Sequence, residues 1–199
     1  GKVSKTQIQL ANMMATIANR GYYYTPHIIK QIKGRKIDTK YTTKHVTTID
    51  RKYFDPIVNG LFDVYNHGTA YGLGVPGLEI CGKTGTAENF AKINGKRVQL
   101  EDHSEFVAFA PRIQPKIAIA VIVENGHYGN TWAGPIATLM IEKYLNKKIT
   151  RKDLEKRMLE GNLNWQYRKL YPAKDSIKKP KLTKVDSLRM KLKSKKEIE

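Results

Sequence analysis

The ten residues ICGKTGTAEN, Ile80 to Asn89, place one lysine and two threonines among glycines, directly after an apolar residue. Glycine lets another molecule approach the backbone closely because it has no Cβ. A phosphate-binding loop also combines these residue types, but it follows an apolar strand. Here the preceding stretch NHGTAYGLGVPG has the composition of a loop, so a different ligand fits better.

The side chains of this stretch suit recognition of a peptide that ends in a free carboxylate. Alternate side chains of a strand share a face, so we expect Thr84 and Thr86 to point the same way. Gly85 between them opens the strand edge to close approach. Such an edge pairs with an extended peptide, and two hydroxyls near the Lys83 ammonium hold a carboxylate.

Length and composition indicate one buried core with a basic extension. The 199 residues carry a formal net charge of +18, and residues 151–199 hold 16 of the 36 basic but only 7 of the 18 acidic residues. This surplus favours polyanions such as nucleic acid, anionic lipid or acidic cell-wall polymer, although charge runs more often form a solvated tail. No stretch reaches the roughly 18 apolar residues of a membrane span, and residues 1–6 are no signal segment.

Three stretches have the periodicity of amphipathic helices. The first covers Thr6–Arg20, before the C-cap residue Gly21. Its apolar stripe consists of Ile8, Ala11, Met14, Ala15 and Ile17. The second covers Asp50–Tyr65, with Asp50 as N-cap, and the third covers residues 130–145. The stripe of the second consists of Phe54, Ile57, Val58, Leu61 and Val64.

Three strands are expected after the second helix, over residues 78–86, 105–111 and 116–124. The short connection RIQP predicts that the last two form an antiparallel hairpin. KIAIAVIVE is an almost unbroken apolar run, which predicts burial on both faces of the last strand. Upstream, YYYTPHIIKQI and HVTTI favour short strands or extended arms, with KGRK as a turn.

Helices and strands do not alternate strictly, so the fold class is α+β, an antiparallel sheet packed with helices. After Leu145 the apolar density falls. TRKDLEKRMLEGN is expected to add one or two amphipathic turns, and Pro172–Glu199 is expected to be charged and flexible. The expected division is a domain over residues 1–146 and a basic, partly flexible extension over residues 147–199.

The ordered set KTGTAEN, HSEFVAFAP, KIAIAVIVEN and AGPIATLMIEKYL resembles the class B penicillin-binding proteins, above all the elongation-type, penicillin-binding protein 2 kind. K-T-G is one of three motifs of that family. TQIQLANMMATIANRGYYYTPHII and the NHGTA loop are similar to the helix and turn that precede the K-T-G strand there. The resemblance covers residues 1–146. It implies the C-terminal part of a transpeptidase domain, with three strands of the main sheet of the β-lactamase/transpeptidase-like fold.

The other two motifs of the family are missing from their place before K-T-G. Family members acylate the serine of S-x-x-K, with its lysine as base, and use an S-x-N triplet to relay protons. The only S-x-x-K here is Ser176–Lys179 in the basic tail, and no S-x-N occurs. YGN, Tyr128–Asn130, follows K-T-G instead of preceding it, so both are interpreted as chance matches. We expect both motifs in coding sequence upstream of Gly1.

The resemblance assigns roles to the K-T-G strand. It implies that Lys83 supplies positive potential, that Thr84, Gly85 and Thr86 bind a substrate or β-lactam carboxylate, and that the Thr86 N–H is an oxyanion donor. It implies no cofactor and no metal. The implied partners are stem peptides ending in D-Ala-D-Ala, β-lactams and other cell-elongation proteins. The implied parent is anchored in the bacterial inner membrane with this domain outside the cytoplasm. Without the nucleophile, this chain alone is expected to be inactive.

Two other functions stay open, a non-catalytic interaction module of the same fold and a basic nucleic-acid-binding protein. The second lacks any nucleic-acid-binding motif. His103 has no partner at catalytic spacing, and its neighbours Glu101 and Asp102 point apart from it on an extended chain, so neither catalysis nor metal binding is expected there. Cys81 is interpreted as a small buried hydrophobe.

The resemblance also predicts an open edge on the strand over residues 116–124. In the family this strand lies inside a five-stranded sheet, and two N-terminal strands absent from this sequence cover its far side. An unpaired apolar edge is a template for pairing with another chain. We therefore expect self-association, or pairing with another segment, that strengthens with salt as charge repulsion is screened.

Overall fold

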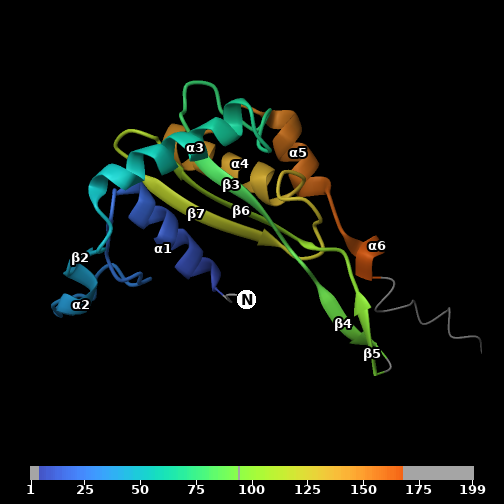
Figure 1. The fold of residues 1–199 in the computed structure, drawn as a ribbon, viewed down its shortest axis with the longest axis horizontal. Helices are drawn as coiled ribbons and strands as arrows, with labels where there is room; N and C mark the ends of the chain where they lie inside the picture. The colour runs from blue at the N-terminus through green and yellow to red at the C-terminus, as the bar shows by residue number, and fades with distance from the viewer. Residues whose placement is uncertain (1–4, 94, 168–199) are drawn as a thin grey trace, which may run out of the picture. The chain divides into compact units, whose positions relative to one another are not determined.

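The computed structural model describes residues 5–93 and 95–167 (Figure 1). By compactness the chain divides into two units, residues 1–162 and residues 163–199. Of the second unit the structure describes the short helix α6 (Asn164–Tyr167), and all other elements belong to the first. The expected flexibility of Pro172–Glu199 concerns residues outside those described, and the expected domain boundary after residue 146 stays a prediction.

A three-stranded antiparallel sheet forms the centre of the first unit. In spatial order its strands are β3 (Cys81–Ala87), β6 (His103–Ala110) and β7 (Ile117–Val123). Thr84 of β3 lies opposite Phe106 of β6, and Val107 of β6 lies opposite Ala120 of β7. The predicted α+β class, the three strands and the hairpin across RIQP are confirmed.

Helices cover both faces of this sheet (Figure 1). α1 (Gln7–Ala18) and α4 (Ala133–Asn146) both contact β6 and β7. Phe109 packs with Met14 of α1, whereas Phe106 packs against α4. Residues three apart on a strand point to opposite faces, so the two phenylalanines define two core layers with the sheet between them.

α3 (Phe54–Asn66) contacts the K-T-G strand β3 and continues from the 3-10 turn η1 (Arg51–Tyr53). The Asp50 carboxylate accepts a hydrogen bond from the Lys52 N–H at 3.2 Å. This contact satisfies an N–H group that would have no partner at the helix start, so the predicted N-cap is confirmed.

The predicted burial of the apolar stripes is only partly correct. Met14 and Val58 are buried, but Ile8 in α1 and Ile57 in α3 are 59% and 52% exposed. In β7 only Ile119 is buried, and the other residues of the strand are half-buried. The prediction that β7 is buried on both faces was therefore wrong. In the described part of the chain β7 lies at the edge of the sheet, where its side chains are only half covered.

Between α1 and η1 the chain forms small pieces of regular structure. β1 (Tyr22–Tyr23) pairs with β2 (His45–Val46), and the one-turn helix α2 (Thr39–Thr42), which the sequence did not predict, lies between them along the chain. The short strands expected here are confirmed over two residues each. A bridge between Ile32 and Arg35 confirms the turn predicted at KGRK.

A hairpin that the sequence analysis missed follows the K-T-G strand. β4 (Phe90–Ile93) pairs with β5 (Lys96–Gln99) in an antiparallel ribbon. The sequence between them is Asn94-Gly95, a dipeptide that strongly favours two-residue hairpin turns. Gly95 has a φ of 79°, a left-handed conformation that glycine adopts without strain.

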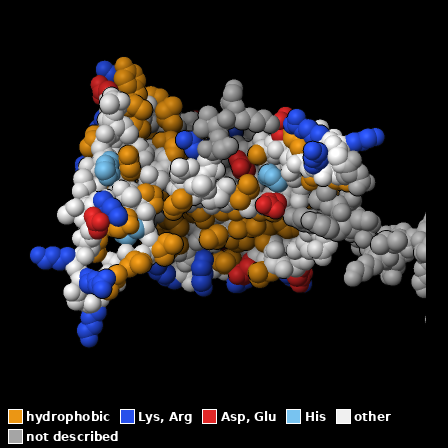
Figure 2. Space-filling view, turned by 90° about the horizontal axis from the view of Figure 1, so that it is seen from below, with side chains coloured by type: hydrophobic (Ala, Val, Ile, Leu, Met, Phe, Trp, Pro, Cys, Tyr) orange, Lys and Arg blue, Asp and Glu red, His pale blue; other side chains and the backbone are white. Residues whose placement is uncertain are grey.

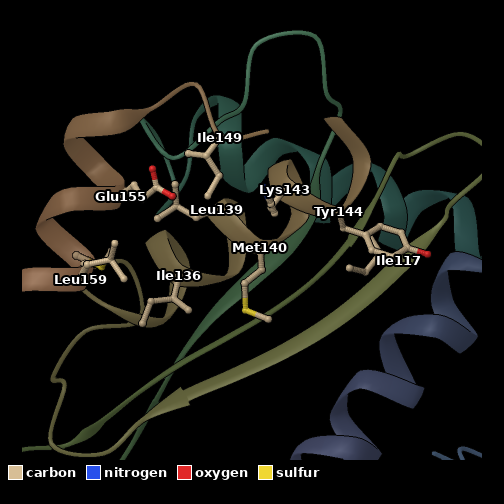
Figure 3. Close-up of a pocket in the computed structure, with 10 residues that line it drawn as sticks. Ile117, Ile136, Leu139, Met140, Lys143, Tyr144, Ile149, Glu155 and Leu159 are labelled. Carbon is tan, nitrogen blue, oxygen red and sulfur yellow. The ribbon is translucent and has the colours of Figure 1, made fainter. Parts of the chain in front are cut away.

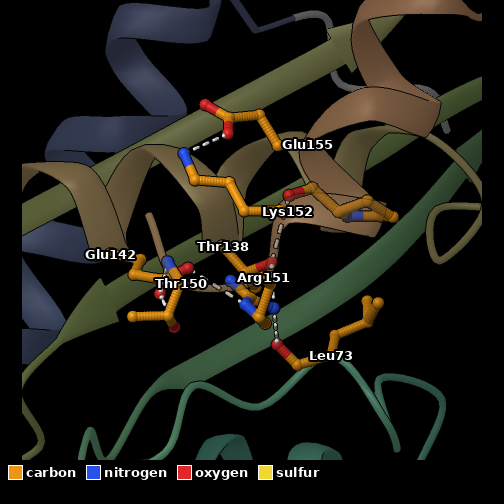
Figure 4. A network of polar contacts seen from close by, with 8 residues as sticks. Leu73, Thr138, Glu142, Thr150, Arg151, Lys152 and Glu155 are labelled. Carbon is orange, nitrogen blue, oxygen red and sulfur yellow. Dashed lines mark hydrogen bonds and ion pairs between the residues drawn. The ribbon is translucent and has the colours of Figure 1, made fainter. Parts of the chain in front are cut away.

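A polar network fastens the segment after α4 to the core (Figure 4). The buried Glu142 carboxylate accepts hydrogen bonds from the Thr150 N–H at 2.8 Å and the Arg151 guanidinium at 3.0 Å. Arg151 also donates to the Leu73 carbonyl oxygen at 3.0 Å. Burial raises the pKa of the Glu142 carboxyl, but the hydrogen bonds from Thr150 and Arg151 outweigh burial, so its pKa lies below the usual value.

Helix α5 (Lys152–Glu160) has nine residues, more than the one or two turns expected. An apolar groove of about 610 Å³ lies between α4 and α5 (Figure 3). Its lining includes Ile117, Ile136, Leu139, Met140, Tyr144 and Leu159. Because Ile117 begins β7, the groove adjoins the free edge of the sheet.

Candidate active site

Strand β3 carries the K-T-G residues at one edge of the central sheet. It pairs with β6 on one side, and no strand in the described part of the chain pairs with its other edge. Lys83 and Thr86 are exposed, while Thr84 and Gly85 are half-buried. The open edge leaves backbone donors and acceptors for an extended peptide, next to charged and hydroxyl side chains.

The two threonines lie on one face of β3 and the lysine on the other. Residues paired across strands share a face, and Thr84 is paired with Phe106, which packs against α4. Lys83 is paired with Val107, which belongs to the α1 side of the core. Thr84 and Thr86 therefore point the same way, as the alternation predicts. The Lys83 ammonium donates to the Thr84 carbonyl oxygen at 2.8 Å.

Thr69, from the NHGTA loop after α3, extends the site. Its Oγ1 lies 2.7 Å from the Thr84 Oγ1, and either hydroxyl can be the donor. When Thr69 donates, the Thr84 hydroxyl keeps its own proton for a ligand. Sequence reasoning identified this loop as the turn that precedes the K-T-G strand along the chain but missed the pair, because no local pattern relates a loop threonine to a strand threonine 15 residues later.

A carboxylate side chain occupies the space beside Gly85. A Cβ built on Gly85 would lie 3.1 Å from the Glu105 Cβ and 3.2 Å from its Oε2, and the two residues are paired across β3 and β6. The glycine therefore accommodates Glu105 on the Lys83 face. A ligand that approaches β3 on this face meets a negative charge, which the sequence analysis did not anticipate.

The turn after β7 folds over the K-T-G strand. A Cβ on Gly129 would lie 2.9 Å from the Gly85 carbonyl oxygen and 3.0 Å from the Thr84 Cβ, so only glycine fits here without displacement. Tyr128 beside it is exposed. Tyr128–Asn130 is interpreted as a chance match to an S-x-N-like triplet, yet its central residue Gly129 lies against the K-T-G strand.

A polar network anchors this turn to the end of the K-T-G stretch. The Asn89 side-chain amide donates to Asn125 Oδ1 at 2.6 Å and to the Glu101 carbonyl oxygen at 3.2 Å. The Asn125 N–H donates to His103 Nδ1 at 3.1 Å. The network thus gives His103 a structural contact. Asn89 and Asn125 are 36 residues apart, and sequence reasoning singled out neither.

Ser104 is the only serine among the described residues 5–93 and 95–167. It is buried, its hydroxyl donates to the Tyr128 carbonyl oxygen at 2.8 Å, and it accepts from the Ala133 N–H at 3.1 Å. A nucleophilic hydroxyl must be exposed to substrate and hydrogen-bonded to a base. Ser104 instead fastens the turn to the start of α4.

Two other interpretations of this region are settled by geometry. Burial raises the pKa of the Cys81 thiol to about 12, so the thiol stays protonated and packs with Phe109 as a small hydrophobe, as expected.

The spacing of glycines, lysine and threonine from Gly77 to Thr84 also matches the phosphate-binding loop pattern. That loop needs a helix after it, and here these residues lead into strand β3.

Neither a metal cluster nor a bilayer-crossing helix occurs within the part of the chain that the structure describes. No group of three or more His, Cys, Asp or Glu side chains there is arranged to hold a metal ion. The helices there are too short or too polar to cross a membrane.

A K-T-G strand at the edge of an antiparallel sheet, with helices on both faces, is typical of the proteins that recognise penicillins, which include the penicillin-binding proteins and the serine β-lactamases. Residues 1–142 match the family model described as the penicillin binding protein transpeptidase domain. The chain belongs to this family.

Curated relatives place it among the penicillin-binding protein 2 type. It is 35% identical over 164 residues to the peptidoglycan D,D-transpeptidase MrdA of Acinetobacter baumannii, covering 76% of this chain and 24% of the relative. It is 34% identical over 152 residues to the peptidoglycan D,D-transpeptidase PbpA of Mycobacterium tuberculosis, covering 72% of this chain and 30% of the relative. The matched part of the chain thus spans 24% and 30% of the lengths of these two relatives.

Solved structures agree on the fold. Penicillin-binding protein A of Mycobacterium tuberculosis, in an imipenem acyl-enzyme complex, superposes with a TM-score of 0.59 at 29% identity over 73% of this chain and 32% of that one. PBP2 of Pseudomonas aeruginosa, in complex with WCK 5153, superposes with a TM-score of 0.58 at 30% identity over 76% and 32%. The mixed helix and antiparallel-sheet architecture is therefore that of penicillin-binding proteins.

Proposed function

We propose that this chain is the carboxylate-binding part of a peptidoglycan D,D-transpeptidase, an enzyme that cross-links cell-wall stem peptides through a serine acyl-enzyme. The observation that carries the proposal is the open edge of β3, where the exposed Lys83 and Thr86 flank the half-buried Thr84. This edge can pair with an extended peptide, and its hydroxyls can hold the terminal carboxylate.

Each side chain has a proposed role in that reaction. Thr84 and Thr86 share a face, so both hydroxyls can donate to one carboxylate of a D-Ala-D-Ala peptide or a β-lactam. Thr69 orients the Thr84 hydroxyl through the 2.7 Å contact. Lys83 supplies positive potential, and the Thr86 N–H is one oxyanion donor, whose loss in such sites costs about 100- to 1000-fold in rate.

The nucleophile belongs to residues that the described part of this chain lacks. Ser104 is buried and engaged in two hydrogen bonds, and the one S-x-x-K, Ser176–Lys179, lies outside the described residues in a strongly basic tail. A serine supplied by the rest of the parent protein would attack the peptide carbonyl and release the terminal D-Ala. Alone, this chain binds the carboxylate but forms no acyl-enzyme.

Mass spectrometry of the 199-residue chain after incubation with a penicillin tests this proposal. The expected mass is that of the unmodified chain, because the one serine of the described residues, Ser104, is buried and not activated by a base. A stoichiometric adduct on Ser176 or Ser104 that disappears in a Lys83→Ala variant would show a complete site and overturn the proposed division of the active site. The matched control is Lys92→Gln, which changes an exposed lysine of β4.

The partners of the parent enzyme follow from the same proposal. Its substrates are stem peptides ending in D-Ala-D-Ala, and the acyl-enzyme complex with imipenem of the Mycobacterium tuberculosis relative supports β-lactams as ligands. We further propose that the parent has a membrane anchor outside this sequence. This domain would then lie on the extracytoplasmic side, with other elongation proteins as neighbours. Detection of the parent in the inner-membrane fraction, accessible to an external protease, would support this location.

A further inference from the structure

Residues 24–49, here called the isoleucine arm, connect β1 to the start of η1 and expose an unusual number of apolar side chains. Within it Ile28 is fully exposed, and Ile29 is 62% exposed. The other exposed large apolar residues are Tyr24, Ile32, Ile37, Val46 and Ile49. Isolated exposed apolar residues are ordinary, but a cluster of this size marks an interaction surface.

The isoleucines surround a hollow of about 690 Å³. Ile28, Ile29, Ile32 and Ile37 line it together with Tyr41 of α2. The backbone here is mostly irregular, with one bridge and one helical turn. The arm therefore presents aliphatic side chains on a surface that the described part of the chain leaves uncovered.

Basic residues surround these isoleucines. The arm contains six of them and one acidic residue, Asp38. The basic residues are Lys30, Lys33, Arg35, Lys36, Lys40 and Lys44. Asp38 lies 3.3 Å from the Lys40 ammonium, so its charge is already compensated within the arm. At the left-hand end of Figure 2, Lys and Arg side chains project around hydrophobic ones.

We propose that the isoleucine arm docks on the anionic surface of a phospholipid bilayer. Ile28, Ile29 and Ile32 insert among the lipid headgroups, and the neighbouring lysines and arginine contact lipid phosphates. Surfaces that bind membranes without spanning them combine exposed apolar side chains with Lys and Arg in this way. This inference does not depend on the proposed transpeptidase function.

The combination of side chains favours a bilayer over a soluble polyanion. Single-stranded nucleic acids are bound mainly through charge and through aromatic stacking on bases, and neither contact needs a cluster of exposed isoleucines. A bilayer uses both features, since the basic residues meet its negative surface potential and the aliphatic side chains leave water.

Co-sedimentation of the 199-residue chain with vesicles gives the first test. The probes are vesicles of phosphatidylcholine alone and vesicles with about one third phosphatidylglycerol. We expect binding to the second and little to the first. An Ile28→Ser/Ile29→Ser variant should bind the anionic vesicles about tenfold more weakly or worse, as expected when two inserted aliphatic side chains are removed. The matched control is Leu159→Ser in α5, which removes an apolar side chain that is 79% exposed elsewhere, and should bind as the unchanged chain does.

The charge component is tested with Arg35→Gln/Lys36→Gln, two basic residues that line the hollow. Removing two such charges should weaken binding to anionic vesicles about 25-fold, at about 1 kcal/mol for each basic residue. Lys92→Gln/Lys96→Gln in the β4–β5 hairpin is the matched control and should weaken binding far less.

A label shows whether the arm itself inserts, because the basic residues 168–199 can bind anionic vesicles by charge alone. Ile28→Cys, labelled with an environment-sensitive dye, should shift its emission to the blue on anionic vesicles. A label at Leu159→Cys should not shift, and the native Cys81 is buried from the reagent. An unshifted Ile28→Cys label on sedimented protein would overturn the proposal. Equal binding of the double isoleucine variant to anionic vesicles would also overturn it. So would complete displacement from the vesicles by a soluble acidic polypeptide that displaces the unchanged chain and the isoleucine variant equally well.

Discussion

The Thr69 hydroxyl lies 2.7 Å from the Thr84 hydroxyl, so a loop residue from the segment before the sheet contacts the middle residue of K-T-G. A hydroxyl has one proton to donate but can accept from other donors. If Thr69 donates, Thr84 is oriented with its own proton free for a carboxylate. In that orientation, two hydrogen bonds in series would connect the NHGTA loop to the proposed carboxylate ligand.

Replacing Thr84 with Val in the complete parent enzyme tests the role of this hydrogen-bonded pair. The change removes a hydroxyl but little volume, so folding should survive. The activation free energy of acylation by a β-lactam should rise by about 1.5 to 3 kcal/mol, the contribution of a hydrogen bond to a charged group, so acylation should slow. Thr69→Val should slow it less, since Thr69 acts through Thr84, and Thr69→Ser should restore the rate. Acylation rates measured by stopped flow would contradict the carboxylate role if Thr84→Val were as fast as the unchanged enzyme.

Gly129→Ala should destabilise the fold. The new Cβ would clash first with the Glu105 carbonyl oxygen of β6, and would lie 2.9 Å from the Gly85 carbonyl oxygen and 3.0 Å from the Thr84 Cβ, so the turn after β7 must move away from both strands. Overpacking of this kind costs about 1 to 3 kcal/mol in unfolding free energy. Gly60→Ala is the matched control. Its Cβ meets nothing within 4 Å inside α3, so it should raise stability by about 0.5 to 1 kcal/mol. Urea denaturation of both variants measures these changes in unfolding free energy. Equal stabilities of the two variants would contradict the close packing of Gly129.

Glu142→Gln should cost about 2 to 3 kcal/mol in unfolding free energy, because the charged hydrogen bond to Arg151 is lost within a buried site. The pKa of Glu142 is lowered in the folded chain relative to the ordinary value of 4.5. Its contribution to stability is therefore fully present above about pH 4.5 and is lost as pH falls through the lower folded pKa.

Thermal unfolding from pH 7 down to pH 3 measures this dependence. The unchanged chain should lose more stability over the acid end of the range than Glu142→Gln does, because the glutamine cannot titrate. Glu160→Gln, which removes a surface partner 3.9 Å from the Lys156 ammonium, is the control and should change stability by less than about 1 kcal/mol. Parallel pH curves for the unchanged chain and Glu142→Gln would contradict the role given to the carboxylate.

The free edge of β7 should promote self-association of the 199-residue chain. In the described residues β7 pairs only with β6, and the apolar groove between α4 and α5 adjoins it through Ile117. The net charge of +18 opposes association, and salt screens that repulsion. Sedimentation velocity should therefore show larger species at high salt than at low salt. A single monomeric species in both would mean that the edge attracts no partner.

Local patterns predicted the elements whose signals are local. Pro111 and the short RIQP connection predicted the β6–β7 hairpin, and Asp50 predicted the start of η1. The alternation in β3 predicted that Thr84 and Thr86 share a face. The Asn94-Gly95 dipeptide was an equally local signal for the β4–β5 hairpin, and it was overlooked.

Contacts that depend on the tertiary fold could not be predicted from such patterns. Glu105 fills the space beside Gly85 because β6 pairs with β3 in one particular register. Asn89 meets Asn125 because the turn after β7 folds back over the strand. Register and loop packing are set by the whole core, so a single sequence shows the K-T-G residues but not their neighbours.

The most direct test of the central claim is an NMR titration of the 199-residue chain with an acyl-D-Ala-D-Ala peptide. We expect the amide signals of Thr84, Gly85 and Thr86 to shift with the free-carboxylate peptide and not with the same peptide carrying a C-terminal amide. A Thr86→Val variant should weaken the shifts. Equal shifts with both peptides, or shifts confined to residues away from β3, would contradict the claim that this strand binds the carboxylate of the substrate.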